Sequence, residues 1–144
     1  MVNILGWEYP EGLYYSKDHM WVKIEDGKAR VGLTEYGQHL ASKILFIRLK
    51  SKGSTVKQDR ILGTLESGKW VGPIKAPLSG KVVEVNEDLK SRSMVKLINE
   101  DPYGRGWIAV IEPSNLEEEK KNLMVKPEEI EPWLKKEIEK YEKK

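Results

Sequence analysis

Residues 61–85 read ILGTLESGKWVGPIKAPLSGKVVEV, and this stretch decides the fold. Side chains in residues 61–66 alternate in the rhythm of a β-strand, and residues 71–76 resume an extended run. Between them lies Gly68, which has access to backbone angles that are closed to most residues, so we expect a turn there. The stretch therefore predicts a hairpin that holds Lys69 at its tip, with the amine facing water.

A second turn follows this hairpin, at Pro77, Ser79 and Gly80, and residues 82–85 then form a third strand. An exposed lysine is ordinarily a solvated charge and nothing more. The residues around Lys69 are what single it out.

Composition excludes several classes of function. The chain has 144 residues, enough for one domain, with a net charge of +2 and charged residues of both signs making up 33 %. This mixture gives no basic stripe for nucleic acid. Cysteine is absent, so disulfides, thiolate metal sites and cysteine nucleophiles are excluded. With two histidines only, we do not expect an acid–base enzyme. Without a long apolar run or a signal pattern, we expect a soluble cytoplasmic protein with no membrane contact.

The rest of the chain predicts short strands and short helices. Strands are expected at residues 20–25 and 29–33, joined by the turn Asp26-Gly27, and at 43–49 in a central position. In the first half of the chain we also expect an irregular N-terminal arm with a short strand at 13–15, a helix capped by Thr34 and an extended piece near Val56. In the second half we expect a helical turn capped by Asn86, a helical piece or packed loop at 94–98, a strand at 107–111, a helix capped by Ser114 or Asn115, and an amphipathic helix from Trp133.

The tip residues resemble those of a known family. The sequence Glu66-Ser67-x-Lys69, followed by Pro77 and Ser79-Gly80-x-Val82, is similar to the lipoyl-lysine hairpin of the glycine cleavage system H protein family. A biotin carrier fits less well, because those domains flank their lysine with methionines. The resemblance implies that lipoic acid is attached to Lys69 as lipoamide.

Further segments resemble the same family in the expected order, over residues 14–124. They are His19-x-Trp21-Val22, Val31-Gly32-x-Thr34-x-Tyr36-Gly37-Gln38, Ile44-Leu45-Phe46-Ile47, Val83-x-Val85-Asn86-x-x-Leu89 and Asn99-x-Asp101-Pro102-Tyr103-Gly104-x-Gly106-Trp107. The resemblance implies a mainly β protein, a barrel-sandwich hybrid of short antiparallel strands with short helices and a C-terminal helix. We expect residues 1–126 to form the carrier domain, including the N-terminal arm, and residues 127–144 to form a helical extension packed on or near it.

The family resemblance implies a non-catalytic carrier. Its lipoyl arm would collect an aminomethyl group from glycine decarboxylase, a pyridoxal-phosphate enzyme, and pass it to an aminomethyltransferase. Dihydrolipoamide dehydrogenase would reoxidise the arm, and a lipoate ligase or transferase would attach it. We expect the carrier itself to be a monomer.

The tip and the cleft supply the candidate site residues. We expect Glu66, Ser67 and Gly68 to serve ligase recognition and the turn, although Glu66 is also an ordinary solvent-facing strand residue. We expect His19, Met20 and Trp70 to line a cleft for the arm. The family has glutamate where this chain has Met20, and that glutamate is thought to help hold the loaded arm. Methionine cannot replace its charge-assisted hydrogen bond.

Trp70 also departs from the family, which has alanine after the modified lysine. Its indole could shield the arm, dock a partner or cap the end of the barrel.

Three other functions stay open at this stage. The loss of a carboxylate at Met20 is compatible with an H-like lipoyl carrier of a sulfur-oxidation pathway that works beside heterodisulfide-reductase-like complexes. An interaction module that kept the fold without modification would tolerate replacement of Lys69. A standalone lipoyl-dependent enzyme would need a base, a nucleophile or a set of metal ligands, and the sequence offers none of these. The C-terminal helix is read as a solvated helix laid on the body rather than a partner-binding helix.

Overall fold

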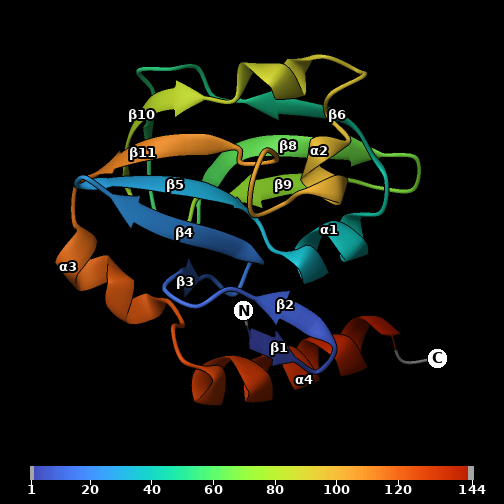
Figure 1. Ribbon diagram of the computed structural model, residues 1–144. Coiled ribbons are helices and arrows are strands. Elements are labelled where there is room, and N and C mark those ends of the chain that lie inside the picture. Colours follow the sequence, from blue (N-terminus) through green and yellow to red (C-terminus); the bar gives the residue numbers. More distant parts are fainter. Residues whose placement is uncertain (1, 143–144) are drawn as a thin grey trace.

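The computed structural model describes residues 2–142, and its main feature is a pair of β-sheets that face each other (Figure 1). A six-stranded sheet has the order β3-β4-β5-β11-β10-β7, and a three-stranded sheet has the order β6-β8-β9. A separate two-stranded hairpin, β1-β2, lies at the N-terminus. All paired strands are antiparallel. The expectation of a mainly β barrel-sandwich of short strands is confirmed.

The elements follow one another along the chain with short connections. They are β1 (Val2–Ile4), β2 (Trp7–Tyr9), β3 (Tyr14–Tyr15), β4 (Met20–Glu25), β5 (Lys28–Leu33), α1 (Glu35–Ala41), β6 (Ile44–Leu49), β7 (Thr55–Val56), β8 (Ile61–Ser67), β9 (Val71–Lys75), β10 (Gly80–Val85), η1 (Glu87–Lys90), α2 (Leu97–Glu100), β11 (Ala109–Pro113), α3 (Leu116–Glu119), η2 (Lys120–Asn122) and α4 (Pro127–Glu142).

Local sequence signals account for most of these boundaries. The turn between β4 and β5 has positive φ angles at both Asp26 and Gly27, as a two-residue hairpin turn requires. The Thr34 hydroxyl accepts a hydrogen bond from the N–H of Gly37 at 3.0 Å and so caps α1. Asn86 caps η1 in the same manner, accepting from the N–H of Asp88 at 3.2 Å. These three predictions are confirmed.

The prediction of a central strand at residues 43–49 is wrong. β6 is an edge strand of the three-stranded sheet and pairs with β8 alone. Ile47 and Leu49 on one face pack against the main core, whereas Phe46 on the other face is 41 % exposed. The run of apolar residues on both faces therefore reflects one core-facing set and one exposed set.

The main core fills the space between the two larger sheets. Met20 and Val22 of β4 meet Leu62 and Leu65 of β8 in one buried cluster, together with Val82 of β10. Trp21, on the opposite face of β4, is buried as well, at 1 % exposed. Its indole N–H donates to the carbonyl of Pro102 at 2.9 Å, so the opposite face of β4 is covered as well.

That covering comes from a second apolar cluster. The N-terminal arm forms the β1-β2 hairpin instead of an irregular segment, and it packs with Trp21, Tyr36 and the C-terminal helix α4. In Figure 1 α4 lies along this hairpin, beneath the body of the molecule. Ile130 and Leu134 are the fully buried residues of α4, so the helix is laid on the body as expected.

The start of α4 differs from the prediction. The helix runs from Pro127 to Glu142 and includes Pro132, whereas the sequence predicts a helix from Trp133. Proline fits the first turn of a helix, and Pro132 lies one turn later at an exposed position, where it removes one helical hydrogen bond. The carboxylate of Glu129 accepts from the N–H groups of Val125 and Lys126, both at 2.9 Å, and thereby fixes the helix start.

The preceding helical segment also differs from the prediction. α3 and η2 form a short, broken helix that starts after Asn115, but neither Ser114 nor Asn115 makes a side-chain cap hydrogen bond. The expected boundary at residue 126, between the carrier domain and the helical extension, stays a prediction. The last two residues of the extension lie outside the described part of the chain.

Candidate functional site

Lys69 lies at the tip of the β8-β9 hairpin, at the right of Figure 1, with its side chain exposed. The N–H of Ser67 donates to the carbonyl of Trp70 at 2.8 Å and closes the tip. The Ser67 hydroxyl accepts from the N–H of Lys69 at 3.2 Å, so a buried serine holds the backbone of the lysine in place. The tip is thus tied internally by hydrogen bonds while the amine reaches solvent.

Gly68 forms the turn as expected, but for a different reason. Its φ angle is not among the positive values found in the described residues, and a Cβ placed there would meet no atom within 4 Å. The turn therefore does not need the conformational freedom of glycine. The absence of a side chain instead leaves open space next to Lys69.

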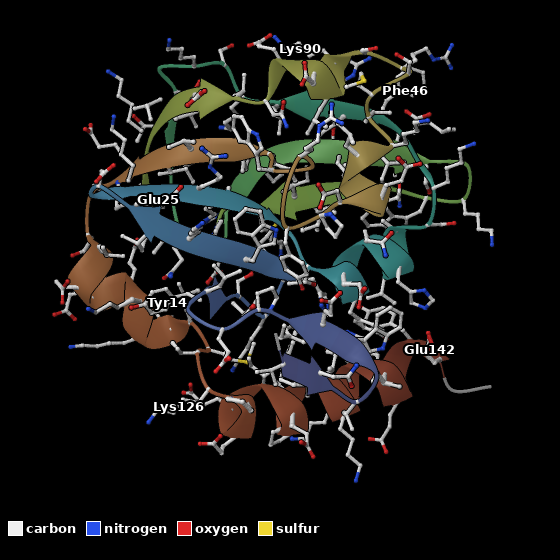
Figure 2. The ribbon with its side chains drawn as sticks, viewed as in Figure 1. Tyr14, Glu25, Phe46, Lys90, Lys126 and Glu142 are labelled. Atoms are coloured by element: carbon white, nitrogen blue, oxygen red, sulfur yellow. The ribbon has the colours of Figure 1, made fainter. Side chains whose placement is uncertain are left out.

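Glu66 lies on the exposed face of β8, in the row that runs toward the tip. It is paired in register with Phe46 of β6 on one side and Val71 of β9 on the other. Both neighbours are exposed, at 41 % and 67 %, and Figure 2 shows Phe46 at the outer edge of the sheet. The carboxylate is thus flanked on both sides by exposed apolar side chains.

A cavity of about 460 Å³ lies beside the hairpin. Its walls come from the loop before β4, from α1, from the hairpin strands and from the last turns of α4. Trp70, the neighbour of Lys69, lines it, and so do His19 and Met20. The three residues expected to form a cleft for the arm therefore do line one cavity, whereas the tip residues from Glu66 to Lys69 lie outside it.

The indole of Trp70 lies over the backbone of β9. A Cβ at Gly72 would overlap this ring, so the glycine provides the space in which it packs. The ring is nevertheless 44 % exposed. Trp70 thus contributes to the cavity wall from the position next to Lys69 in the chain.

His19 lines the cavity next to two aromatic side chains. Its ring lies 4.9 Å from that of Trp133 and 5.5 Å from that of Tyr36, measured between centroids. Its Nε2 atom is 2.8 Å from Oε1 of Glu137. Burial lowers the pKa of His19, and this effect outweighs the opposing influence of Glu137. The neutral ring therefore donates its Nε2 hydrogen to the carboxylate, and Nδ1 is left buried without a partner.

The residues that α4 contributes were not expected from the sequence. Glu137, Lys140 and Tyr141 line the cavity, and Asp18 adds a second carboxylate. Burial raises the pKa of Asp18, while the charge of Lys75 partly opposes this shift. The helical spacing predicted the apolar face of α4, but no local signal places Glu137 beside a histidine 118 positions earlier.

The fold and this tip define a class of protein, the barrel-sandwich carriers that present one exposed hairpin lysine. The comparisons with known proteins agree. The sequence matches the Glycine cleavage H-protein family over residues 13–137. This chain belongs to the glycine cleavage H-protein family.

Individual relatives cover most of the chain. It is 48 % identical over 127 residues to the probable glycine cleavage system H protein 2 of Sulfolobus acidocaldarius, a match that covers 85 % of this chain and 84 % of that protein. It is 46 % identical over 127 residues to the glycine cleavage system H protein 2 of Aquifex aeolicus, covering 87 % and 78 %.

A solved structure supports the fold in the same manner. The crystal structure of a glycine cleavage system H protein from Mycobacterium marinum superposes with a TM-score of 0.69 at 34 % identity, covering 74 % of this chain and 87 % of that one. The family and fold predictions are therefore confirmed.

No helix within residues 2–142 is long and apolar enough to cross a membrane. No group of three or more histidine, aspartate or glutamate side chains within residues 2–142 is arranged to hold a metal ion.

Proposed function

We propose that this chain is the lipoyl carrier of a glycine cleavage system and that its arm is attached to Lys69. The observation that carries the proposal is the exposed amine of Lys69 on an internally tied hairpin tip, in a member of the H-protein family. The relatives bear the name of the glycine cleavage system, and this supports the pathway. The sulfur-oxidation alternative gains no support from these relatives.

The residues at the tip fit the proposed modification. Among the described residues no ion pair involves Lys69, so its amine is available for amide formation. When bound, lipoic acid supplies a dithiolane on a flexible chain, which accepts a carbon unit on sulfur while its disulfide is reduced. The chain's own residues position the attachment point, and Trp70 and the apolar lining of the cavity give the arm a sheltered surface.

The remaining roles follow from this carrier function. We propose that Glu66, Ser67 and Gly68 present the tip to a lipoate ligase or transferase. The other partners would be a glycine decarboxylase, an aminomethyltransferase and dihydrolipoamide dehydrogenase. The chain would act as a non-catalytic, monomeric subunit in the cytoplasm. Residues 1–126 would carry these functions, with the C-terminal extension closing one side of the cavity.

A reconstitution tests the function. Purified protein is lipoylated with a lipoate ligase, lipoate and ATP, and then incubated with a glycine decarboxylase, with and without glycine. Glycine-dependent appearance of protein thiols, with release of one CO₂ for each free thiol because the second sulfur carries the carbon unit, supports the proposal. Lipoylated protein that stays oxidised with glycine, but is reduced by dihydrolipoamide dehydrogenase and NADH, would contradict the pathway.

A further inference from the structure

Charges of both signs are mixed over the chain as a whole, but not along residues 43–60. This segment contains β6, the turn after it, β7 and the loop that leads to β8. It carries a net charge of +5 and one acidic residue, Asp59, whereas all other residues together carry −3. Its six cations are all exposed and are named the basic strip: Lys43, Arg48, Lys50, Lys52, Lys57 and Arg60.

The basic strip is not neutralised by ion pairs within the molecule. None of its six side chains pairs with a carboxylate of residues 2–142. Lys90, Lys120 and Lys121, by contrast, each pair with a glutamate three positions earlier. The charges of the basic strip therefore face solvent and can act on an approaching molecule.

The basic strip begins beside the tip that carries Lys69. Ile44, the residue after Lys43, is paired in register with Ser67 at the base of the tip. β6 then runs antiparallel to β8, so Arg48 lies further from the tip along the same edge of the sheet. A protein that covers the basic strip therefore also lies beside Lys69.

An exposed aromatic ring lies among these cations. Residues 46, 48 and 50 alternate with core-facing residues, so Phe46, Arg48 and Lys50 project from the same exposed side. The guanidinium of Arg92 lies 4.7 Å from the centroid of the Phe46 ring, and Figure 2 shows this phenylalanine at the outer edge of the sheet. Phenylalanine and arginine are enriched at protein–protein interfaces. A nucleic-acid strand would instead need several free rings for base stacking.

The opposite side of the molecule has the opposite charge. In Figure 1 β6 lies at the top and α4 at the bottom. Residues 127–142, which form α4, carry a net charge of −3. This separation of charge turns the β6 side toward an acidic partner during encounter and turns α4 away from it.

We propose that the basic strip, together with Phe46, is the docking surface for an acidic face of the enzyme that loads the arm. The inference rests on the proposed carrier function, in which that enzyme is a glycine decarboxylase. Loading requires two macromolecules to meet in one orientation, and complementary charge raises the rate of such encounters. Docking on the basic strip places the tip, and the arm on Lys69, at the border of the interface.

The experiment compares two triple variants of the full-length lipoylated protein that have the same net charge. One removes three cations of the basic strip: Arg48→Gln, Lys50→Gln and Lys52→Gln. The matched control removes three exposed lysines elsewhere, on the β4-β5 turn and on α4: Lys28→Gln, Lys135→Gln and Lys136→Gln. Initial rates of CO₂ release from labelled glycine by a glycine decarboxylase give kcat/KM for each carrier, at ionic strengths from about 0.02 to 0.3 M.

We expect the basic-strip variant to lose about ten-fold or more in kcat/KM at low ionic strength, mainly through KM, and to depend less on salt than wild type does. The control variant should stay within about two-fold of wild type. Lys69→Arg protein, which cannot carry the arm, should compete with wild type for the enzyme. Adding the basic-strip substitutions to it should remove this competition, a readout that does not involve the arm.

The outcomes separate the docking surface from the function beneath it. Wild-type protein that accepts lipoate but is not loaded from glycine would contradict the carrier function and the inference together. Normal loading, with the same kcat/KM and salt dependence in both triple variants, overturns the docking surface alone. An effect confined to transfer by an aminomethyltransferase, or to binding of anionic vesicles or DNA, overturns the loading enzyme as the partner. Equal melting temperatures of the variants show that they are folded.

Discussion

The Nε2 atom of His19 lies 2.8 Å from Oε1 of Glu137, a contact between residues 118 positions apart. It joins the loop before β4 to the C-terminal helix in the lining of the cavity beside the β8-β9 hairpin. The second histidine, His39 of α1, makes a similar contact with Glu142 at 2.8 Å, near the end of α4 in Figure 2. Both histidines of the chain thus pair with the helix that closes the carrier's cavity.

The His19 contact predicts a specific dependence of stability on pH. In the unfolded chain His19 has its ordinary pKa of 6.5, whereas burial lowers the pKa in the folded state. Between these values the unfolded state binds more protons, so the free energy of unfolding falls as the pH drops below 6.5 and levels off below the folded-state pKa. Urea unfolding at a series of pH values between about 5 and 8, the range in which histidine titrates, measures this change in the free energy of unfolding.

His19→Asn is the variant that isolates the effect. Asparagine tolerates the positive φ of 67° at this position and does not titrate. The difference between wild type and variant removes the contributions of other groups near the ring, which are Asp18, Glu137 and Lys140. Parallel pH profiles for the two proteins would show that His19 is not the source.

Docking of α4 depends on Leu134, which is fully buried in the second apolar cluster. We predict that Leu134→Ala lowers the free energy of unfolding by about 2–4 kcal/mol, through lost burial and the cavity left behind. Lys135→Ala, on the exposed side of the same turn, should change it by less than about 0.5 kcal/mol. Equal effects of the two substitutions in urea unfolding would show that α4 does not depend on this contact.

Recognition by the modifying enzyme is expected to depend on Glu66. Glu66→Gln keeps the shape of the exposed face of β8 and removes its charge, so we predict that lipoylation by a lipoate ligase slows by about ten-fold while the melting temperature stays the same. Glu84→Gln on β10 is the control, because Glu84 is exposed and lies in a different sheet. Mass spectrometry of timed samples gives both rates. A rate for Glu66→Gln equal to that of the control would leave Glu66 as an ordinary surface residue.

Replacement of Lys69 should separate function from folding. We predict that Lys69→Arg abolishes lipoylation, because arginine offers no amine for the amide bond, and that it leaves the melting temperature within about 2 °C of wild type, since an exposed side chain buries little. The control is Lys28→Arg, which replaces an exposed lysine in the β4-β5 hairpin. This variant should be lipoylated to the same extent as wild type. A large loss of stability in Lys69→Arg would contradict the exposed position of the tip.

Sequence reasoning located the hairpin because its signals are local. Alternation in residues 61–66, the turn at Gly68 and the position of Lys69 all lie within a few residues of one another. It also found the cap of α1 at Thr34, since a cap acts within three residues. The family resemblance then supplied the arrangement of the sheets, which the local patterns did not determine.

The features that sequence reasoning missed are set by distant contacts. β6 is apolar on both faces, yet whether it is central or at an edge depends on how many strands pair with it. The β1-β2 hairpin is stabilised by α4, which lies at the other end of the chain. α4 continues through Pro132 because its buried residues begin earlier, at Ile130. The meeting of His19 and Glu137 depends on all of these placements at once.

The most direct test of the central claim is the intact mass of the protein purified from its native host, with peptide mapping of the β8-β9 hairpin. The carrier function predicts a lipoyl mass increment on the peptide that contains Lys69, and on no other peptide. An unmodified Lys69, in cells whose other lipoyl proteins carry the cofactor, would contradict the claim and assign the fold to an interaction module.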